Sequence, residues 1–417
     1  MNSIKKIKIP NELSLLARAF PVDLFVVGGY VRNQLLGIDH GDVDLCSSLT
    51  VDKLGKIAED CGFSIKYRNK ALGTAKLEYN ERVYDYATFR SETYGDDNGH
   101  RPCDIKFIDS IEDDAKRRDF SINAIYYNIN KETLTDFYNG FYDIRRGIVK
   151  AVETPDFVMQ SDGERILRMI RFAGEFNFKI DKMTYQAALR NVDNLKGISF
   201  DRIVNEIKRI LYCDKKYPQR ARKKTFVSAL KTLNKMDIWS KLGLESSRVN
   251  YNMVKKTKKR EFGLVIDMID TVNPASVSYF INRILKRTSI SKKRGEQIVN
   301  IISGYYDALN KKSNKQYFFK YFDNFDYIFE LLMCKSKNIA LKYQFFYKYI
   351  ISYHLVIKTS DLKISNRDLK ENFPSLPQKM YGDILTEVLS DVFDGKYENE
   401  RNTILKELEA KFTLQKN

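Results

Sequence analysis

The spacing of apolar residues along the chain divides it into two parts. In the N-terminal part, short apolar runs and apolar–polar alternation predict β-strands at 24–27, 42–45 and 105–108 and a hairpin over 77–89. Helical spacing predicts helices over 30–36 and 51–61. The hairpin is expected to turn at Asn80-Glu81, and the polar, glycine-containing stretch 91–104 is expected to be a mobile loop. This part is therefore expected to be mixed α/β.

The C-terminal two thirds show a different pattern. Apolar residues recur there at i, i+3 and i+4, which predicts helices over 166–176, 203–211 and 298–309. The alternation typical of strands almost disappears. The predicted fold class is α+β, with a mixed β-sheet and helices at residues 1–150 and an all-helical remainder. With 417 residues the chain has about three domain lengths, enough for more than one buried core.

The composition excludes several classes of protein. A hydrophobic content of 43%, with 13% aromatic residues and 8 prolines, argues against intrinsic disorder. Apolar runs such as 328–334 are shorter than the roughly 18–20 residues of a membrane span, so no membrane association is expected. The five cysteines form no C-x-x-C pair, which argues against disulfides and zinc and favours a cytoplasmic location. The three histidines are too far apart for a histidine metal motif, which leaves carboxylates, arginines and a hard metal ion.

The formal net charge of +17 indicates a polyanionic partner, although a basic surface that only confers solubility is as compatible with charge alone. The basic clusters lie in the helical part and are interleaved with Tyr and Phe, which favours an RNA or DNA track. For any single cluster, a solvated helix end is an equal alternative. The candidate RNA-binding residues are Lys223, Lys224, Lys258, Lys259, Arg260, Lys292 and Lys293.

Two glycines separate the first predicted strand from the helix that follows it. Gly28 and Gly29 would let the backbone approach a phosphate closely, and the helix N-terminus offers free N–H groups. Arg32 lies one helical turn further on and could reach the same anion. A purely structural turn is the commoner explanation of a Gly-Gly pair alone.

An acidic pair follows this turn. In a strand, residues i and i+2 point to the same face, so Asp42 and Asp44 would project side by side. Two adjacent carboxylates favour a neutralising cation, and Mg²⁺ binds a few carboxylates and completes its shell with water and phosphate. Asp-x-Asp alone would favour a solvated turn, but its combination with the glycines and Arg32 favours a nucleotide and metal site.

These motifs resemble those of a known family. GGYVRN and GDVDL are similar to the signature of nucleotidyltransferases, and more narrowly of tRNA CCA-adding enzymes and bacterial poly(A) polymerases. RRDFSINA at 117–124 resembles the RRDFTINA block, 161–172 resembles the EDxxR helix, and Asp201-Arg202-Ile203 with Glu206 resembles the ERIxxE block. The resemblance implies a nucleotidyltransferase head at 1–150, a neck at 151–215, and RNA-binding helical body and tail regions at 216–310 and 311–417.

The resemblance also implies roles for individual residues. Asp42 and Asp44 would hold two Mg²⁺ ions, and Asp85 stands where a third acidic residue can occur, with a structural strand carboxylate as an equal alternative. Gly28, Gly29 and Arg32 would hold the triphosphate. Arg118 would contact the triphosphate and Asp119 the ribose, unless the two form only a local salt bridge. The nucleotide-binding set is completed by Asn123, which would support them, and by the selecting residues described next.

Asp162 and Arg165 are three residues apart, so one helical face would present both. A carboxylate accepts hydrogen bonds and a guanidinium donates them, which matches the amino group and ring nitrogen of cytosine and adenine. Uracil and guanine present the reverse order and would leave polar groups unpaired. Arg168 and Arg171 would continue this face towards the phosphates. The family's Glu before Asp162 is replaced by Ser161, and Asn33 stands where the family commonly has Asp.

The resemblance implies a CCA-adding enzyme that uses CTP and ATP and binds the acceptor and TΨC arms of tRNA, with no protein partner required. The stretch 89–102 is similar to the family's flexible loop that accompanies the switch from C to A addition, and 364–369 with 392–400 is similar to the tail of Gram-positive members. A poly(A) polymerase is the nearest alternative. An RNA-binding protein with an inactive polymerase site is the alternative of another class.

Overall fold

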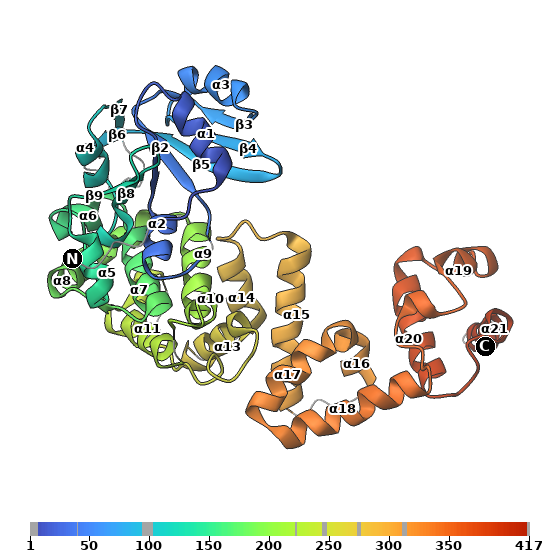
Figure 1. Cartoon of the computed structure of the whole chain (residues 1–417). Helices are drawn as coiled ribbons and strands as arrows, with labels where there is room; N and C mark the ends of the chain where they lie inside the picture. Colours follow the sequence, from blue (N-terminus) through green and yellow to red (C-terminus); the bar gives the residue numbers. More distant parts are fainter. Residues whose placement is uncertain are drawn as a thin grey trace. The chain divides into compact units, whose positions relative to one another are not determined.

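The computed structural model describes residues 7–39, 41–93, 103–221, 223–243, 248–272, 277–310 and 315–414, apart from the side chains of Lys223 and Leu414. Residue contacts group the chain into two compact units, Met1–Val249 and Asn250–Asn417, called unit 1 and unit 2 here (Figure 1). The predicted boundaries at residues 150, 215 and 310 are finer than this grouping and stay predictions.

Unit 1 is built on a seven-stranded sheet with the strand order β3-β4-β5-β2-β1-β8-β9. Its strands are β1 (Phe25–Val27), β2 (Asp44–Ser47), β3 (Ser64–Asn69), β4 (Thr74–Tyr79), β5 (Arg82–Thr88), β8 (Ile125–Asn128) and β9 (Thr133–Asp136). The β2–β5 pair is parallel and the other pairs are antiparallel. The helices between them are α1 (Asn11–Ala19), α2 (Gly29–Leu35), α3 (Val51–Asp60), α4 (Ile111–Lys116) and α5 (Gly140–Arg146).

Most predicted elements of this region are confirmed, with two corrections. The hairpin turns at Asn80 and Glu81, whose φ angles of 46° and 65° match a tight two-residue turn. The strand predicted at 42–45 begins at Asp44, and its residues 45–47 are all buried because β2 lies in the middle of the sheet. The predicted loop 91–104 is bounded by two short strands, β6 (Arg90–Thr93) and β7 (Asp104–Phe107), which pair with each other. Polar side chains do not prevent the backbone hydrogen bonds of such a pair. The remainder of that loop, 94–102, lies outside the described residues.

The rest of unit 1 is helical around α7 (Glu164–Phe176), which is buried on most of its circumference. The other helices are α6 (Pro155–Ser161), α8 (Lys182–Arg190), α9 (Phe200–Leu211), α10 (Cys213–Lys216), α11 (Lys223–Lys235) and α12 (Ile238–Lys241). Gly174 allows α10 to approach α7, because a Cβ there would lie 2.6 Å from the Cys213 sulfur. One short strand, β11 (Lys179–Ile180), pairs in parallel with β10 (Ile148–Val149). The prediction of a wholly helical region is therefore corrected by this one strand.

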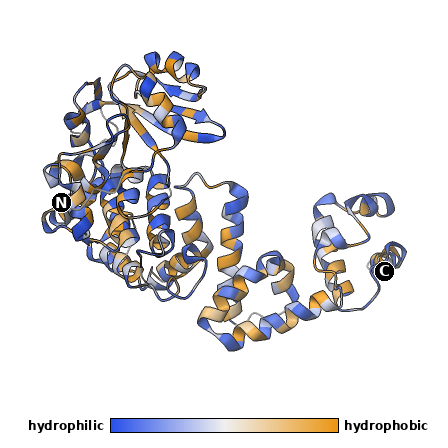
Figure 2. Ribbon diagram, in the orientation of Figure 1, coloured by the Kyte–Doolittle hydropathy of each residue, from blue (hydrophilic) through white to orange (hydrophobic). Residues whose placement is uncertain are grey.

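Unit 2 contains only helices among its described residues, as the spacing predicts. They are α13 (Arg260–Val272), α14 (Val277–Leu285), α15 (Lys292–Leu309), α16 (Lys315–Tyr321), α17 (Phe325–Lys335), α18 (Lys337–Ser352), α19 (Asn366–Asn372), α20 (Tyr381–Phe393) and α21 (Arg401–Leu414). Hydrophobic and hydrophilic residues mark separate stripes along many of them (Figure 2). Across the described ranges, no helix is long and apolar enough to cross a membrane.

Candidate active site

The glycine turn lies beside two of the predicted site residues. Gly28 has φ 76° and ψ −131°, a conformation that side chains with a Cβ rarely adopt. A Cβ at this position would lie 3.6 Å from Oδ2 of Asp44 and 3.8 Å from Nη1 of Arg118. The turn after β1 therefore brings together backbone, a carboxylate and a guanidinium from three distant parts of the sequence.

We expect Gly28→Ala to destabilise the turn by about 1–3 kcal/mol, because the positive φ strains any residue that has a Cβ. Urea unfolding monitored by the sole tryptophan, Trp239, which is buried in unit 1, measures the change in unfolding free energy. Gly29→Ala is the matched control, since φ of Gly29 is not in the positive region and a Cβ there would meet only Nη2 of Arg32, at 3.5 Å. Equal losses in both variants would contradict the strain argument.

The predicted carboxylates gather at the start of β2. Asp44 is its first residue and is paired in register with Asp85 of β5. Asp42 is exposed and precedes the strand, so the two aspartates do not share one strand face as predicted, because the regular strand begins only at Asp44. Burial and the nearby charges of Asp85 and Asp42 raise the pKa of Asp44 to about 6, although Arg118 opposes the shift. This site therefore holds uncompensated negative charge.

Asp42 and Asp44 fit a magnesium site that substrate completes. Across the described residues, no group of three or more His, Cys, Asp or Glu side chains could hold a metal ion. Mg²⁺ commonly uses one or two carboxylates and takes its other oxygens from water and phosphates, and its charge would relieve the repulsion at Asp44. The Asp85 carboxylate instead forms an ion pair with Lys76 at 2.7 Å, which favours the structural alternative for that residue.

Arg32 lies behind the glycine turn in a buried position. Its guanidinium is 4% exposed, donates to the side-chain oxygens of Asn33 and Asn123, and lies 4.5 Å from the centre of the Phe176 ring. Burial lowers the pKa of Arg32 to about 10. These contacts give Arg32 a supporting position beside the turn, and its contact with a triphosphate stays a prediction.

Arg118 and Asp119 of the RRDFSINA block each form an ion pair with another residue, and the described contacts include no local bridge between the two. Arg118 pairs with Asp114 at 3.2 Å and donates to the Tyr126 hydroxyl at 2.7 Å. Asp119 pairs with Arg168 through bonds of 2.9 and 2.5 Å and accepts from Asn123 at 3.0 Å. Burial favours the neutral acid, but Arg168 and Asn123 outweigh it and hold the pKa of Asp119 well below its usual range. The Asp119 carboxyl group therefore stays ionised.

Asp162 and Arg165 do not share a helical face, which corrects the prediction. Helix α6 ends at Ser161, Asp162 is extended with φ −154°, and α7 begins only at Glu164. The Asp162 carboxylate accepts from the Glu164 N–H at 2.9 Å, a typical helix-start interaction that interrupts the helix. It also accepts from Arg202 at 2.7 Å.

Arg165 is fixed by backbone carbonyls. It is 8% exposed and donates to the carbonyl oxygens of Val158 at 3.3 Å and Arg117 at 2.6 Å. Ser161, which replaces the family's glutamate, donates to the same Val158 oxygen at 3.0 Å. Within the described part of the chain, no hydrogen bond joins Ser161 to Arg165, so Ser161 shares an acceptor with the arginine and does not orient it directly.

Arg171 lies in a buried ion-pair network, and its reach towards the phosphates stays a prediction. It is 3% exposed, and its guanidinium bonds Glu206 at 2.7 Å and Glu175 at 3.2 Å. Six residues of α-helix rotate a side chain by about 240°, so Arg171 faces a different side of α7 from Arg165. Arg171 is therefore part of a buried ion-pair network that joins α7 to α9.

Three residues of the site region are not predicted from the sequence. Asp114 is buried beneath Arg118, and its position four residues earlier is an available signal. Arg202 binds both Asp162 and Glu164. The only signal for it in the sequence is its place in the block that resembles ERIxxE. Glu175 pairs with Arg171 four residues earlier, which is again a helical spacing.

The predicted RNA-binding lysines belong to both units. Lys224 is exposed on α11, and the Lys223 side chain lies outside the described residues. In unit 2, Lys258 and Lys259 are exposed before α13, which begins at Arg260, and Lys292 and Lys293 are exposed at the start of α15. Their role stays a prediction.

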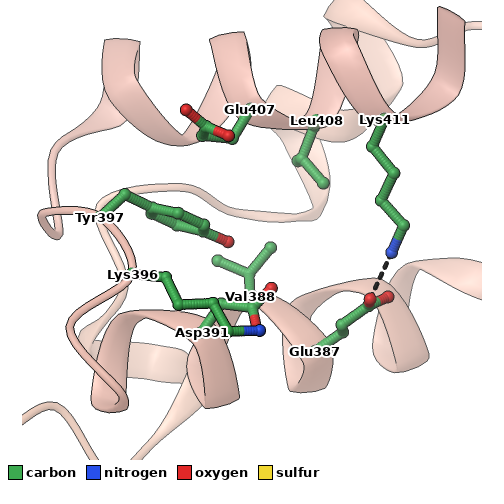
Figure 3. Close-up of a pocket in the computed structure, with 8 residues that line it drawn as sticks. All are labelled: Glu387, Val388, Asp391, Lys396, Tyr397, Glu407, Leu408 and Lys411. Carbon is green, nitrogen blue, oxygen red and sulfur yellow. Dashed lines mark hydrogen bonds and ion pairs between the residues drawn. The ribbon is translucent and has the colours of Figure 1, made fainter. Parts of the chain in front are cut away.

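A separate pocket of about 220 Å³ lies between α20 and α21 (Figure 3). Two of its three carboxylates are already engaged, since Asp391 pairs with Lys396 at 2.6 Å and Glu387 pairs with Lys411, while Glu407 is the third. None of the predicted site residues lines it. We therefore expect the chemistry in unit 1, where Gly28 and Asp44 lie at the ends of β1 and β2.

Comparison with known proteins agrees with this geometry. Residues 24–150 match the model of the poly(A) polymerase head domain. The CCA-adding enzyme of Staphylococcus saprophyticus is 33% identical over 186 residues, which span 45% of this chain and 45% of that protein. The CCA-adding enzyme of Staphylococcus aureus (strain MRSA252) is 24% identical over 400 residues, which span 92% of this chain and 93% of that protein.

Solved structures support the same fold. The Bacillus stearothermophilus CCA-adding enzyme in complex with CTP has a TM-score of 0.72 at 20% identity, and the match covers 97% of this chain and 98% of that one. A tRNA nucleotidyltransferase complexed with a primer tRNA and an incoming ATP analog has a TM-score of 0.57 at 23% identity over 82% of this chain and 99% of that one. These likenesses confirm the α+β class with a polymerase-type head.

The glycine turn, Asp44 and Arg118 lie on a head that is similar to the poly(A) polymerase head domain. Along most of its length the chain is similar to CCA-adding enzymes.

Proposed function

We propose that this chain adds CCA to the 3′ end of tRNA from CTP and ATP, without a nucleic-acid template and with release of pyrophosphate. The observation that carries the proposal is the convergence of Gly28, Asp44 and Arg118 where the central strands β1 and β2 meet at one end. The CCA-adding relatives that align along most of the chain support this choice over other nucleotidyl transfers. tRNA is the proposed partner, and a cytoplasmic location without a required protein partner stays a prediction.

Asp42 and Asp44 are the residues that would hold two Mg²⁺ ions. When bound, such ions activate the attacking hydroxyl and stabilise the leaving pyrophosphate. The protein's own residues bind and orient the nucleotide. Gly28, which lacks a Cβ, lets the triphosphate approach the backbone, and Arg118 lies within reach of its negative charge. Asp119 is held ionised by Arg168 and can accept a hydrogen bond from a ribose hydroxyl.

Asp162 and Arg165 would select the base although they come from a turn and a helix. Backbone groups and Arg202 fix both side chains, which keeps the carboxylate acceptor and the guanidinium donors in place before the nucleotide binds. Such a pair satisfies the amino group and ring nitrogen of cytosine and adenine. Uracil and guanine would place a carbonyl oxygen against the carboxylate and an N–H against the guanidinium, so that neither pair could form a hydrogen bond.

We expect a tRNA transcript that lacks its CCA end to receive C, C and A in that order, with UTP and GTP incorporated at least about a hundredfold less efficiently. Gel analysis with single nucleotides and with mixtures measures kcat/KM for each base. Arg165→Met should lower the discrimination against UTP and GTP, whereas Arg190→Met, an exposed arginine paired only with Asp156 among its described ion pairs, should not.

The alternatives give different products in the same assay. Long A tails that form without any need for CTP would identify a poly(A) polymerase, the function that the name of the head-domain model favours as a second candidate. Retention of the transcript without incorporation of any nucleotide would identify an RNA-binding protein with an inactive site. Comparable use of all four nucleotides would contradict the roles of Asp162 and Arg165.

A further inference from the structure

The segment that precedes α13 has two chemically distinct sides. Its buried side consists of Tyr251, Met253, Val254 and Thr257, each at most 5% exposed. Its exposed side carries Lys255, Lys256, Lys258 and Lys259. These four lysines fall within five consecutive positions, so their charges repel one another in any compact arrangement. We call residues 250–259 the basic turn.

Two carboxylates from different helices hold the backbone of the basic turn. Asp267 on α13 is 3% exposed and accepts from the N–H groups of Met253 and Val254, each at 2.9 Å. Glu330 on α17 accepts from the N–H of Lys258 at 2.8 Å and more weakly from that of Lys259 at 3.4 Å. Both carboxylates therefore bind backbone of the turn.

A glycine allows the turn to lie directly against α13. A Cβ on Gly263 would come within 2.5 Å of the Thr257 hydroxyl and 2.8 Å of the Val254 nitrogen. The glycine and the two carboxylates fix this segment at several points, which a solvated loop with scattered lysines would not require.

Stability does not account for this arrangement. Burying the Asp267 carboxylate and crowding four like charges both cost free energy. Within the described part of the chain, Lys255, Lys256 and Lys259 form no ion pair, and the nearby Glu330 carboxylate binds backbone N–H groups of the turn. No side-chain ion pair therefore offsets the charge of these three lysines. A ligand with closely spaced negative charges would offset it, and the phosphates of an RNA backbone have that property.

We propose that the basic turn is a preorganised site for the RNA phosphate backbone and that Asp267 is a positioning residue for it. The choice of RNA rests on the proposed function. The inference adds to that function the residues of unit 2 that bind the RNA. Fixing the turn before binding reduces the entropy lost when the lysines meet phosphates.

The first test removes lysine charges. Lys255→Gln/Lys256→Gln should weaken binding of a CCA-lacking tRNA transcript by about 25- to 60-fold at 0.1 M salt, and should reduce the slope of log Kd against log salt by about 1.4–1.8. Fluorescence anisotropy over a KCl series measures both quantities. Lys53→Gln/Lys56→Gln on α3 makes the same change in net charge at exposed residues of unit 1 and should stay within about twofold of the unchanged protein.

The second test leaves every lysine in place. In Asp267→Asn the amide NH₂ faces one of the two backbone N–H donors, so one of the two hydrogen bonds is lost and the turn shifts. The variant is more positive by one charge, which by itself would tighten RNA binding, yet we expect weaker binding and a smaller salt slope. Asp270→Asn on the same helix is the matched control with the same charge change, and it should keep the original slope.

Each outcome decides the inference. Normal affinity and salt slope in both Lys255→Gln/Lys256→Gln and Asp267→Asn would overturn it. A lower melting temperature of Asp267→Asn with an unchanged slope for the folded protein would show a structural role only, and would remove Asp267 from the proposal. Variants that lose binding to phosphatidylglycerol vesicles but not to tRNA would show that the partner is a membrane. If the unaltered chain binds tRNA through this turn but adds no CCA, the inference stands and the proposed function fails.

Discussion

Asp44→Asn is expected to reduce nucleotide incorporation by at least about a thousandfold, because it removes a charged ligand for the ions that stabilise the transition state. Asp42→Asn should have a similar effect. The measurement is single-turnover incorporation of C into a tRNA transcript that lacks its CCA end.

Folding and catalysis should separate in this experiment. The pKa of Asp44 in the folded chain, about 6, is higher than that of an aspartate in an unfolded chain. Above pH 6 the folded state therefore loses stability through the ionised carboxylate, and below that pH the loss decreases as the proton binds. Without metal at pH 8, Asp44→Asn should thus unfold at the same or a higher temperature than the unaltered chain. A lower melting temperature with partial activity would contradict the metal-site assignment.

Asp85→Asn is the matched control, because Asp85 is paired with Asp44 in register but its carboxylate binds Lys76. We expect Asp85→Asn to keep activity within about tenfold of the unaltered chain. The variant loses only an exposed ion pair, and such pairs contribute little to stability. A loss as large as that of Asp44→Asn would instead make Asp85 a third acidic residue of the site.

Arg171→Met is expected to destabilise unit 1 by about 3–5 kcal/mol, because it leaves Glu175 and Glu206 buried without their shared partner. Both glutamates are 1% exposed. Urea unfolding followed by Trp239 fluorescence measures the loss.

The same network provides the control for this prediction. In Arg171→Met, Glu206 keeps Arg209 at 2.9 Å and Glu175 keeps Lys216 at 3.8 Å. Combining Arg171→Met with Glu175→Gln and Glu206→Gln removes both buried negative charges and should recover part of the lost stability. If Arg171→Met unfolds normally but raises KM for CTP and ATP, the phosphate role predicted from the sequence is restored and the buried network is not its main function.

The elements around the active site could be predicted because their signals are local. The apolar run of β1, the break at Gly28 and the hairpin turn at Asn80-Glu81 depend on a few adjacent residues, and the structure confirms them. The identity of Asp42 and Asp44 as a pair also follows from adjacency. The neighbour of Asp44 on the next strand could not be predicted in this way. Asp85 is distant in sequence and comes beside Asp44 through the parallel pairing of β2 with β5.

The prediction that Asp162 and Arg165 share one helical face is wrong for a physical reason. It assumes one continuous helix, but the Asp162 carboxylate binds the Glu164 N–H and interrupts it. Gly163 occupies the break, and a Cβ there would lie 2.8 Å from the Asn194 backbone, so a distant segment also fixes this turn. Capping and long-range packing therefore determine where α7 begins, and with it which residues lie outside the helix.

The parallel pairing of β2 with β5 also bears on the order of assembly. β3, β4 and β5 follow one another as a meander, and such local ladders form quickly because little chain entropy is lost in closing them. Asp44 meets Asp85 through the pairing of β2 with β5, which closes over β3 and β4. We therefore expect the strand ends that carry the carboxylates to be completed late, so that a nascent chain can bind a triphosphate only once most of the sheet has formed.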